Sequence, residues 1–191
     1  MTLSGAVLAF LLSVPRFHED AAEPPLQRVD RLSDLARGIA AASYRATCTG
    51  PFASARDCRR IWSGDAVELA ALQAVTAVGE SALSARIQAR GCHPHECDSG
   101  RSQGPMQVQA LGPVSHELWA RIGPGPDGAM AAAWACTLAY SVHAGSCSDR
   151  GRAGIVAGYA SGSSCAWRRA DARAYRWSRA EIKIRALLVQ H

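Results

Sequence analysis

The sequence predicts a mainly α-helical protein built as a single domain. At 191 residues the chain is long enough for one well-buried domain, and two full domains would be cramped. Apolar residues recur at helical spacing in several segments, whereas no alternating strand pattern of useful length and no internal repeat occurs, which argues against a doubly wound sheet. Apolar residues make up 48% of the chain but aromatic residues only 6%, so we expect a core of small side chains in closely packed helices.

Composition and charge divide the chain into three parts. We expect an apolar segment and linker over 1–29, the main domain over 30–167, and a basic amphipathic helix over 168–191. Residues 1–14 are apolar enough for a signal-peptide core, but they lack a basic start, and no small-x-small cleavage site is evident before Glu23. The run is also shorter than the roughly 18 apolar residues that span a bilayer. It is therefore either an export or anchoring signal, or a terminal helix that packs on the domain or a partner.

Helix signals single out one central segment. Asp30 and Asp65 are expected at or near N-caps, and Glu68 lies in the first turn after Asp65, where an acid suits the positive end of the helix dipole. Apolar residues in the helix after Asp65 point in several directions, so most of its circumference should be buried. Residues 123–128 form a turn cluster between two helices. The predicted helices cover residues 30–44, 53–62, 65–80, 129–143, 155–160 and 168–190.

A line of polar residues runs along the central helix. Gln73, Thr76 and Glu80 are spaced i, i+3 and i+7, so they share one helix face, and the line ends at a carboxylate. One interpretation is a solvated stripe on a surface helix. The other is a helix that forms the wall of a cleft, with Glu80 as a catalytic acid.

Three separated segments, in this order, resemble the soluble lytic transglycosylases and goose-type lysozymes. Glu80-Ser81 after an apolar helix resembles the catalytic Glu-Ser of that family, residues 104–108 (Gly-Pro-Met-Gln-Val) resemble its Gly-Leu-Met-Gln-Ile segment, and residues 158–162 (Gly-Tyr-Ala-Ser-Gly) resemble its Ala-Tyr-Asn-Ala-Gly segment. The resemblance covers about residues 64–165 and implies a lysozyme-like helical fold. Ser161 or Ala160 stands where the family usually has asparagine, which puts that polar contact in doubt.

The resemblance implies cleavage of the β-1,4 bond between N-acetylmuramic acid and N-acetylglucosamine in peptidoglycan. Breaking this bond requires protonation of the leaving oxygen by a partly desolvated carboxyl group, and Glu80 is the acid with that predicted setting. Most glycosidases use a second carboxylate. The family often dispenses with it, because the substrate's own acetamido and 6-hydroxyl groups can do that work and leave a 1,6-anhydro product. If a second acid takes part, as in a hydrolytic lysozyme, Glu96 or Asp98 is nearest.

The same resemblance assigns substrate contacts. Gln107 would hydrogen-bond the sugar, Met106 would line the cleft, and Tyr159 would pack or hydrogen-bond close to Glu80. Each has a structural alternative: Met106 as a core residue, Gln107 as a helix-start residue, and Tyr159 as a buried tyrosine with an ordinary partner. The predicted substrate-binding residues are Gln73, Thr76, Ser81, Met106, Gln107, Tyr159 and Ser161.

Seven cysteines point to an oxidising destination more than to a set of buried thiols. Their short separations invite the sequential pairs Cys48/Cys58, Cys92/Cys97 and Cys136/Cys147, although spacing alone does not establish connectivity. The segment 92–97, Cys-His-Pro-His-Glu-Cys, also offers four conceivable zinc ligands. Ligands so tightly clustered rarely complete one tetrahedral site, so we expect a disulfide that stiffens the loop, with free thiols as a further alternative. We predict no metal and no other cofactor.

The last helix carries the net charge. Residues 168–190 contain seven basic groups and two acids, a net charge of +5 that equals that of the whole chain. Arg169, Arg173 and Arg176 lie on one stripe, which is either a solvated face of a packed helix or a surface for an acidic cell envelope. We expect no nucleic-acid partner, because a binder's charge more often coats its whole domain.

Rival functions remain open. The predicted partner is the glycan strand of peptidoglycan, reached in the periplasm or cell envelope, or from a bacteriophage particle. One rival is a non-catalytic structural or wall-binding protein with the same fold, for example a component of such a particle. Another is a small zinc protein built on the segment 92–97.

Overall fold

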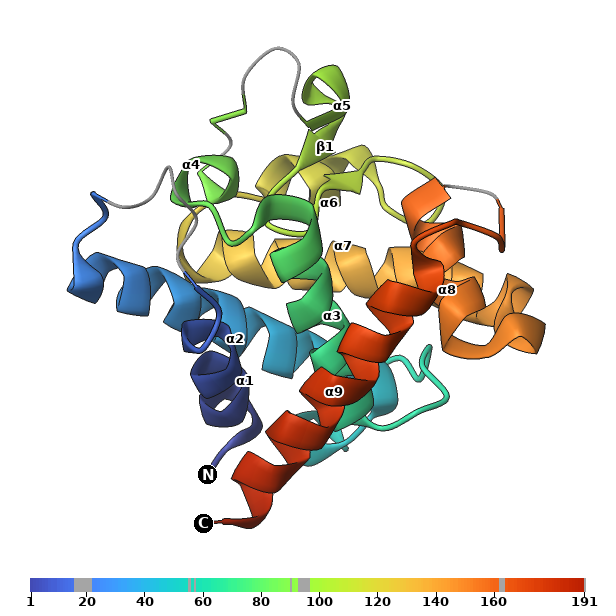
Figure 1. The fold of residues 1–191 in the computed structure, drawn as a ribbon, viewed down its shortest axis with the longest axis horizontal. Coiled ribbons are helices and arrows are strands. Elements are labelled where there is room, and N and C mark those ends of the chain that lie inside the picture. Colours follow the sequence, from blue (N-terminus) through green and yellow to red (C-terminus); the bar gives the residue numbers. More distant parts are fainter. Residues whose placement is uncertain are drawn as a thin grey trace.

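The structure, a computed structural model, is mainly helical (Figure 1). It describes residues 1–15, 22–54, 56, 58–89, 91–92, 97–161 and 164–190. Helices make up 70% of the described residues, which confirms the mainly α class. The elements in chain order are α1 (Leu3–Leu12), α2 (Pro25–Thr47), the 3-10 turn η2 (Gly50–Phe52), α3 (Ala66–Ser81), α4 (Ala85–Gln88), α5 (Cys97–Gly100), β1 (Ser102–Gln103), β2 (Val108–Gln109), α6 (His116–Arg121), α7 (Gly125–Ser146), the 3-10 turn η3 (Ser148–Arg150), α8 (Gly151–Ser161) and α9 (Ala170–Val189).

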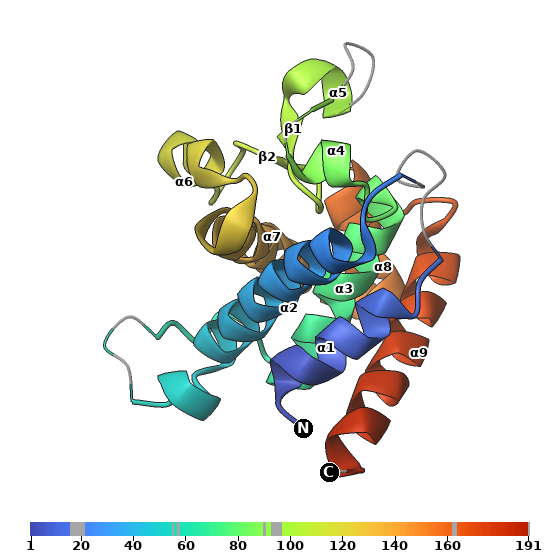
Figure 2. The ribbon, with the colours of Figure 1, turned by 90° about the vertical axis from the view of Figure 1, so that its left-hand side faces the viewer.

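The two longest helices, α2 and α7, pack on each other at the centre of the fold (Figures 1 and 2). Gly38 of α2 makes their close approach possible, because a Cβ atom there would lie 2.8 Å from the backbone carbonyl of Ala129 in α7. The remaining core is rich in alanine, as the composition predicts. Small side chains thus let the two helix backbones come together.

Helix α3 is buried over most of its length. The Asp65 carboxylate accepts a hydrogen bond of 2.8 Å from the N–H of Glu68, which confirms Asp65 as the N-cap. Residues 69–77 are all buried, because α3 packs against α1, α2, α7 and α9. After Ser81 the chain leaves the helix through left-handed residues Ala82 and Leu83.

The boundaries of α2 differ from the expected ones. The helix begins at Pro25 and not at Asp30, because a proline fits the first helical turn, where its missing N–H is not needed. Asp30 is therefore an interior residue of α2 and no N-cap.

The predicted helix over 53–62 is wrong in the part of it that the structure describes. The N–H groups of Arg59 and Ile61 donate to the carbonyls of Arg45 and Ala46 in the last turn of α2. These carbonyls have no partner within the helix, so the returning chain completes the end of α2 instead of forming its own helix.

The predicted turn at 123–128 is shorter than expected, because α7 begins at Gly125. Pro126 lies in the first turn of α7, where proline is tolerated.

Helix α8 also begins earlier than expected, at Gly151, four residues before the predicted start. The hairpin of β1 and β2, in which Ser102 pairs with Gln109, is too short for a sequence pattern to predict.

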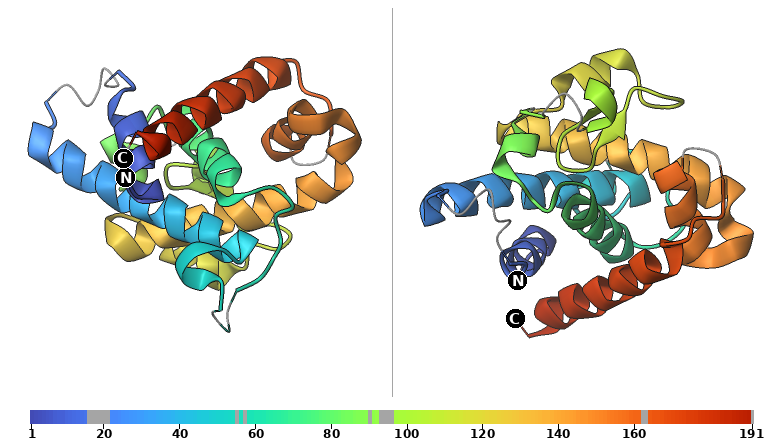
Figure 3. Two further views of the ribbon diagram at one scale, coloured as in Figure 1. Left: turned by 90° about the horizontal axis from the view of Figure 1, so that it is seen from below. Right: turned by 45° about the horizontal axis from the view of Figure 1, so that its top comes forward.

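Both terminal helices belong to the packed structure. Leu3, Ala6, Val7 and Leu11 of α1 are buried, and α1 contacts α2, α3 and α9, as the interpretation of a terminal packing helix predicts. Helix α9 lies along α3, and the N-terminal end of α1 comes close to the C-terminal end of α9 (Figure 3). Trp177 of α9 is fully buried, and its Nε1 donates a hydrogen bond of 2.9 Å to the carbonyl of Glu68.

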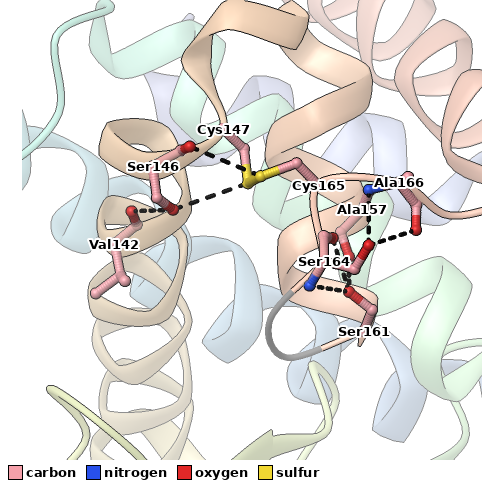
Figure 4. The surroundings of a disulfide bond; sticks show 8 residues. All are labelled: Val142, Ser146, Cys147, Ala157, Ser161, Ser164, Cys165 and Ala166. Carbon is pink, nitrogen blue, oxygen red and sulfur yellow. Dashed lines mark hydrogen bonds between the residues drawn. A yellow bond between two sulfur atoms is a disulfide. The ribbon is translucent and has the colours of Figure 1, made fainter.

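Three disulfides join cysteines of the described residues, and one pair differs from the expected set. Cys48–Cys58 and Cys92–Cys97 form as predicted, but the third bond joins Cys147 to Cys165 (Figure 4). Cys136 remains a buried free thiol. It lies on α7 eleven residues before Cys147, about 16 Å along the helix axis, so the pair Cys136/Cys147 is impossible. Three disulfides are typical of an oxidising environment.

The segment 92–97 lies only partly within the described residues. Its two cysteines are joined to each other, whereas His93, His95 and Glu96 fall outside the description. The described residues hold no group of three or more histidines, cysteines or acids that could bind a metal ion. Of the helices that the structure describes, none is long and apolar enough to cross a membrane.

The close approach at Gly38 makes a testable prediction. Gly38→Ala should lower the free energy of unfolding by about 1–3 kcal/mol, because the new methyl group meets backbone atoms that cannot move independently. Gly145→Ala is the matched control, since a Cβ at this exposed position of α7 meets nothing within 4 Å. It should stabilise the protein by about 0.5–1 kcal/mol. Urea unfolding measures the change in the free energy of unfolding for each variant. Equal changes in the two variants would contradict the close approach of the helices at Gly38.

Candidate functional site

A cavity of about 510 Å³ opens between the end of α3, the β1–β2 hairpin, α7 and α8. Four of the predicted site residues line it and come from three distant parts of the sequence: Glu80, Gln107, Tyr159 and Ser161. Asp98, Val108 and Ala160, which the sequence analysis also mentions, line it as well. Sequence reasoning assigned no role at this site to the other lining residues, which are Gln109, Leu111, Gly112, Pro113, Ala139, Val142 and His143.

Glu80 is held by a buried arginine from the last helix. Its Oε1 pairs with Nη1 of Arg173 in α9, and the two side chains are 24% and 8% exposed. The guanidinium of Arg173 lies over Gly79, where an added Cβ atom would be 3.3 Å from Nη2. The central carbon of the same guanidinium lies 5.0 Å from the centre of the Trp167 ring. The ion pair gives the buried guanidinium the acid partner that a charge removed from water requires.

The burial of Arg173 corrects the expected stripe of solvated arginines. Arg173 is buried, whereas Arg169 and Arg176 are exposed. Spacing could have indicated this, since Arg173 precedes the buried Trp177 by four residues and follows the buried Ala170 by three. The buried face of α9 therefore includes one charged residue, and that residue needs an acid partner.

The predicted role of Gln73 and Thr76 as cleft contacts is wrong. Both are fully buried and lie outside the cavity. Gln73 Nε2 donates to Ser43 Oγ in α2 at 3.3 Å and to Thr137 Oγ1 in α7 at 3.1 Å. Thr76 shares a hydrogen bond of 2.8 Å with the Tyr140 hydroxyl. The polar line therefore joins three helices inside the core, and only its last member, Glu80, reaches the cavity.

Ser81 and Met106 are also buried, so their side chains do not line the cavity. The Ser81 hydroxyl donates to the Ala77 carbonyl and accepts from the N–H of Leu83, which ends α3. Met106 is fully buried, which confirms its alternative as a core residue. Its backbone carbonyl accepts a hydrogen bond of 2.7 Å from the Tyr159 hydroxyl.

Gln107 reaches the cavity from the tight turn between β1 and β2. It has φ +51°, and both its N–H and its Nε2 donate to the carbonyl of Gly104. Its alternative as a helix-start residue is wrong. Gly104 has φ +70°, and a Cβ there would lie 2.5 Å from Ile122 Cγ2, so this turn requires glycine on both counts.

Two stacked tyrosines lie beside Glu80, and one of them, Tyr159, lines the cavity. The rings of Tyr140 and Tyr159 stack with centres 4.2 Å apart. Burial raises the pKa of both tyrosines and of the nearby Cys136 thiol, so these groups stay neutral at physiological pH. Tyr159 thus has an ordinary hydrogen-bond partner and also lines the cavity.

Asp98 contributes a second carboxylate to the cavity. Hydrogen bonds from Ser102 Oγ and from Gln109 Nε2, the latter at 2.7 Å, lower its pKa, so this group stays ionised. Of the two acids considered as a second catalytic group, Asp98 is thus at the cavity, while Glu96 lies outside the described residues.

Two further residues shape the α8 side. His143 packs against Gly158, where a Cβ would lie 2.6 Å from its Nδ1, and burial lowers the pKa of His143, which favours the neutral imidazole. The Ser161 hydroxyl is engaged with the backbone of Ala157 and Ser164 at the end of α8, close to the Cys147–Cys165 disulfide (Figure 4). Ser161 lines the cavity with a hydroxyl that already has partners.

Comparisons with protein-family models, with curated protein sequences and with solved structures find no match. The chemistry of the cavity is therefore inferred from its own residues.

The Glu80–Arg173 pair can be measured by a double-mutant cycle. Glu80→Gln and Arg173→Met should each lower the free energy of unfolding by about 1–3 kcal/mol, because each leaves a partly buried group without its partner. The double variant should lose less than the sum by about 1 kcal/mol or more. The pair Arg37–Asp34 is the control, because its arginine is 63% exposed and Arg173 only 8%, and its expected coupling is about 0.5 kcal/mol or less. Equal coupling energies in the two cycles would show that the burial of Arg173 does not strengthen its ion pair with Glu80.

Proposed function

We propose that the protein is a lysozyme-like peptidoglycan lytic transglycosylase with Glu80 as its single catalytic acid and base. The observation that carries this proposal is that Glu80, Gln107 and Tyr159, one from each of the three resembling segments, line one cavity. They are 27 and 52 residues apart in the chain, so their convergence is not a consequence of local sequence. The disulfides suit the cell envelope, where the glycan strands of peptidoglycan would be the partner.

The reaction needs one carboxyl group used twice. Glu80 in its protonated form donates its proton to the glycosidic oxygen, and the bond from that oxygen to the anomeric carbon breaks. The 6-hydroxyl of the same muramic acid then attacks the anomeric carbon, and the Glu80 carboxylate takes the hydroxyl proton. The products are a 1,6-anhydro end and a new non-reducing end, and the enzyme is restored. Gln107 would orient the sugar beside the bond.

Arg173 is a positioning residue for this chemistry. The groups next to Glu80 are the cation Arg173 and the neutral Tyr140, Tyr159 and Cys136. The ion pair with Arg173 holds the Glu80 carboxyl group at the cavity, while the proton is transferred by Glu80 itself.

Glu80→Gln should reduce the release of soluble muropeptides from purified sacculi about a hundredfold or more, because the amide can neither donate nor accept the proton. Circular dichroism and urea unfolding check that the variant is folded. The double variant Glu80→Gln/Arg173→Met should recover stability and remain inactive. Normal clearing of sacculi by folded Glu80→Gln would end the mechanism.

The matched control is Arg173→Gln, which removes the same ion pair and keeps the carboxyl group. We expect it to retain cleavage within about tenfold of the wild-type rate, because the carboxyl group that transfers the proton is still present. A folded Arg173→Gln that is as inactive as Glu80→Gln would contradict the single-acid assignment. A wild-type protein that binds sacculi and releases nothing would instead fit a non-catalytic wall-binding protein, as in a bacteriophage particle.

Asp98 favours hydrolysis as a second candidate reaction, because an ionised carboxylate at the same cavity could activate water. Mass spectrometry of the released muropeptides separates the two reactions. Transglycosylation predicts 1,6-anhydro ends that persist in Asp98→Asn, within about threefold of the wild-type rate. Hydrolysis predicts reducing ends, and about a hundredfold loss in Asp98→Asn. Ser102→Ala, which removes one hydrogen bond to Asp98 and keeps the carboxylate, is the control.

A further inference from the structure

A second concave site lies away from the cavity, in the groove between α1, α3 and α9. Its volume is about 400 Å³, and apolar atoms dominate its lining. Val75 and Val78 of α3 and Phe10 of α1 line it, together with the small side chains of Ala180 and Ala186 in α9. The lining residues are Phe10, Val75, Val78, Arg176, Arg179, Ala180, Ile182, Lys183 and Ala186.

Three cations of α9 border this groove without an acid partner among the described residues. Arg176, Arg179 and Lys183 are spaced i, i+3 and i+7, so they follow one side of the helix. Arg176 donates to the Ala172 carbonyl, and Lys183 Nζ donates to Ser13 Oγ at 2.8 Å, but neither pairs with a carboxylate.

Three other cations in and around α9 have acid partners. Arg173 pairs with Glu80, and Arg185 pairs with Asp65 and Glu181. Arg152 of α8 pairs with Glu68 and Glu181. The acids of this region therefore neutralise the other sides of α9, and the groove side keeps its positive charge.

We propose that this groove binds an anionic phospholipid at a membrane surface, with its acyl chain against α3 and its phosphate at Arg176, Arg179 and Lys183. An apolar trough bordered by cations is complementary to an acyl chain that carries an anionic headgroup. The row of cations suits the plane of phosphates at a bilayer surface. Ile182 and Tyr175, 60% and 66% exposed, lie on the outer surface of the same helix, where they would contact the bilayer interface. This proposal does not depend on the proposed reaction.

Lipid binding can be tested by flotation of the intact protein with vesicles of phosphatidylglycerol and phosphatidylcholine in equal parts. The wild type should bind these vesicles and not vesicles of phosphatidylcholine alone. The variant Arg176→Gln/Arg179→Gln/Lys183→Gln should bind about tenfold or more weakly, because it removes three cations from the surface. Arg59→Gln/Arg60→Gln/Arg121→Gln is the matched control, since it removes three exposed cations elsewhere and gives the same net charge.

A groove-filling variant tests the acyl chain separately from the charge. Ala186 is exposed and lines the groove, so Ala186→Trp should fill part of it without disturbing the core or the charge. We expect it to weaken vesicle binding about threefold or more while circular dichroism stays unchanged. In the wild type, binding should fall with added salt and persist in part, since only the electrostatic component is screened.

Three results would overturn the proposal. Equal weakening by the two triple variants would mean that the net charge of the protein is attracted to the vesicles without a site. Unchanged binding by Ala186→Trp would mean that the groove takes no acyl chain. Absence of vesicle binding, together with a dimer in analytical ultracentrifugation that Ala186→Trp abolishes, would assign the groove to a second copy of the chain.

Discussion

The enclosure of α3 by its neighbours determines how the rest of this protein is arranged. Residues 69–77 are all buried, so the helix contributes little surface between its first and its last turn. There it presents Glu80, a charged side chain at the negative end of a helix dipole, where a carboxylate is unfavourable without a partner. Arg173 supplies that partner from α9, almost a hundred residues further along the chain. The position of α9 is thus coupled to the charge state of the cavity.

A buried polar network fixes the helices that meet at this point. Gln73 connects α3 to α2 and α7, and Thr76 connects α3 to Tyr140. Polar groups in a core of alanine are costly unless they are paired, so this network specifies one arrangement of the helices more strongly than interchangeable small apolar residues could. Tyr140 then stacks on Tyr159, and Tyr159 holds the backbone of Met106. The hairpin that carries Gln107 is placed through this chain of contacts.

The two concave sites share α9 as a common element. Its buried face places Arg173 against Glu80, and a neighbouring face borders the groove with Arg176, Arg179 and Lys183. Because α9 is a single helix packed along α3, a surface held against the groove would be fixed in orientation relative to the cavity. An enzyme that acts on a polymer next to a membrane would gain from such a fixed orientation.

Local patterns in the sequence determined the helical class and the Asp65 cap. Each of these depends on residues within about one to three helical turns, so spacing is sufficient to predict it. The spacing of the cysteines suggested two of the three disulfides, and the resembling segments suggested Glu80. Tertiary structure alone decided that Gln73 and Thr76 serve the core, that Cys147 pairs with Cys165, and that Arg173 meets Glu80. These outcomes depend on which helices lie side by side, and helical periodicity identifies a buried face without identifying its neighbour. The sequence identified Glu80 as a candidate, whereas its ion pair with Arg173 follows only from the packing of α9 against α3.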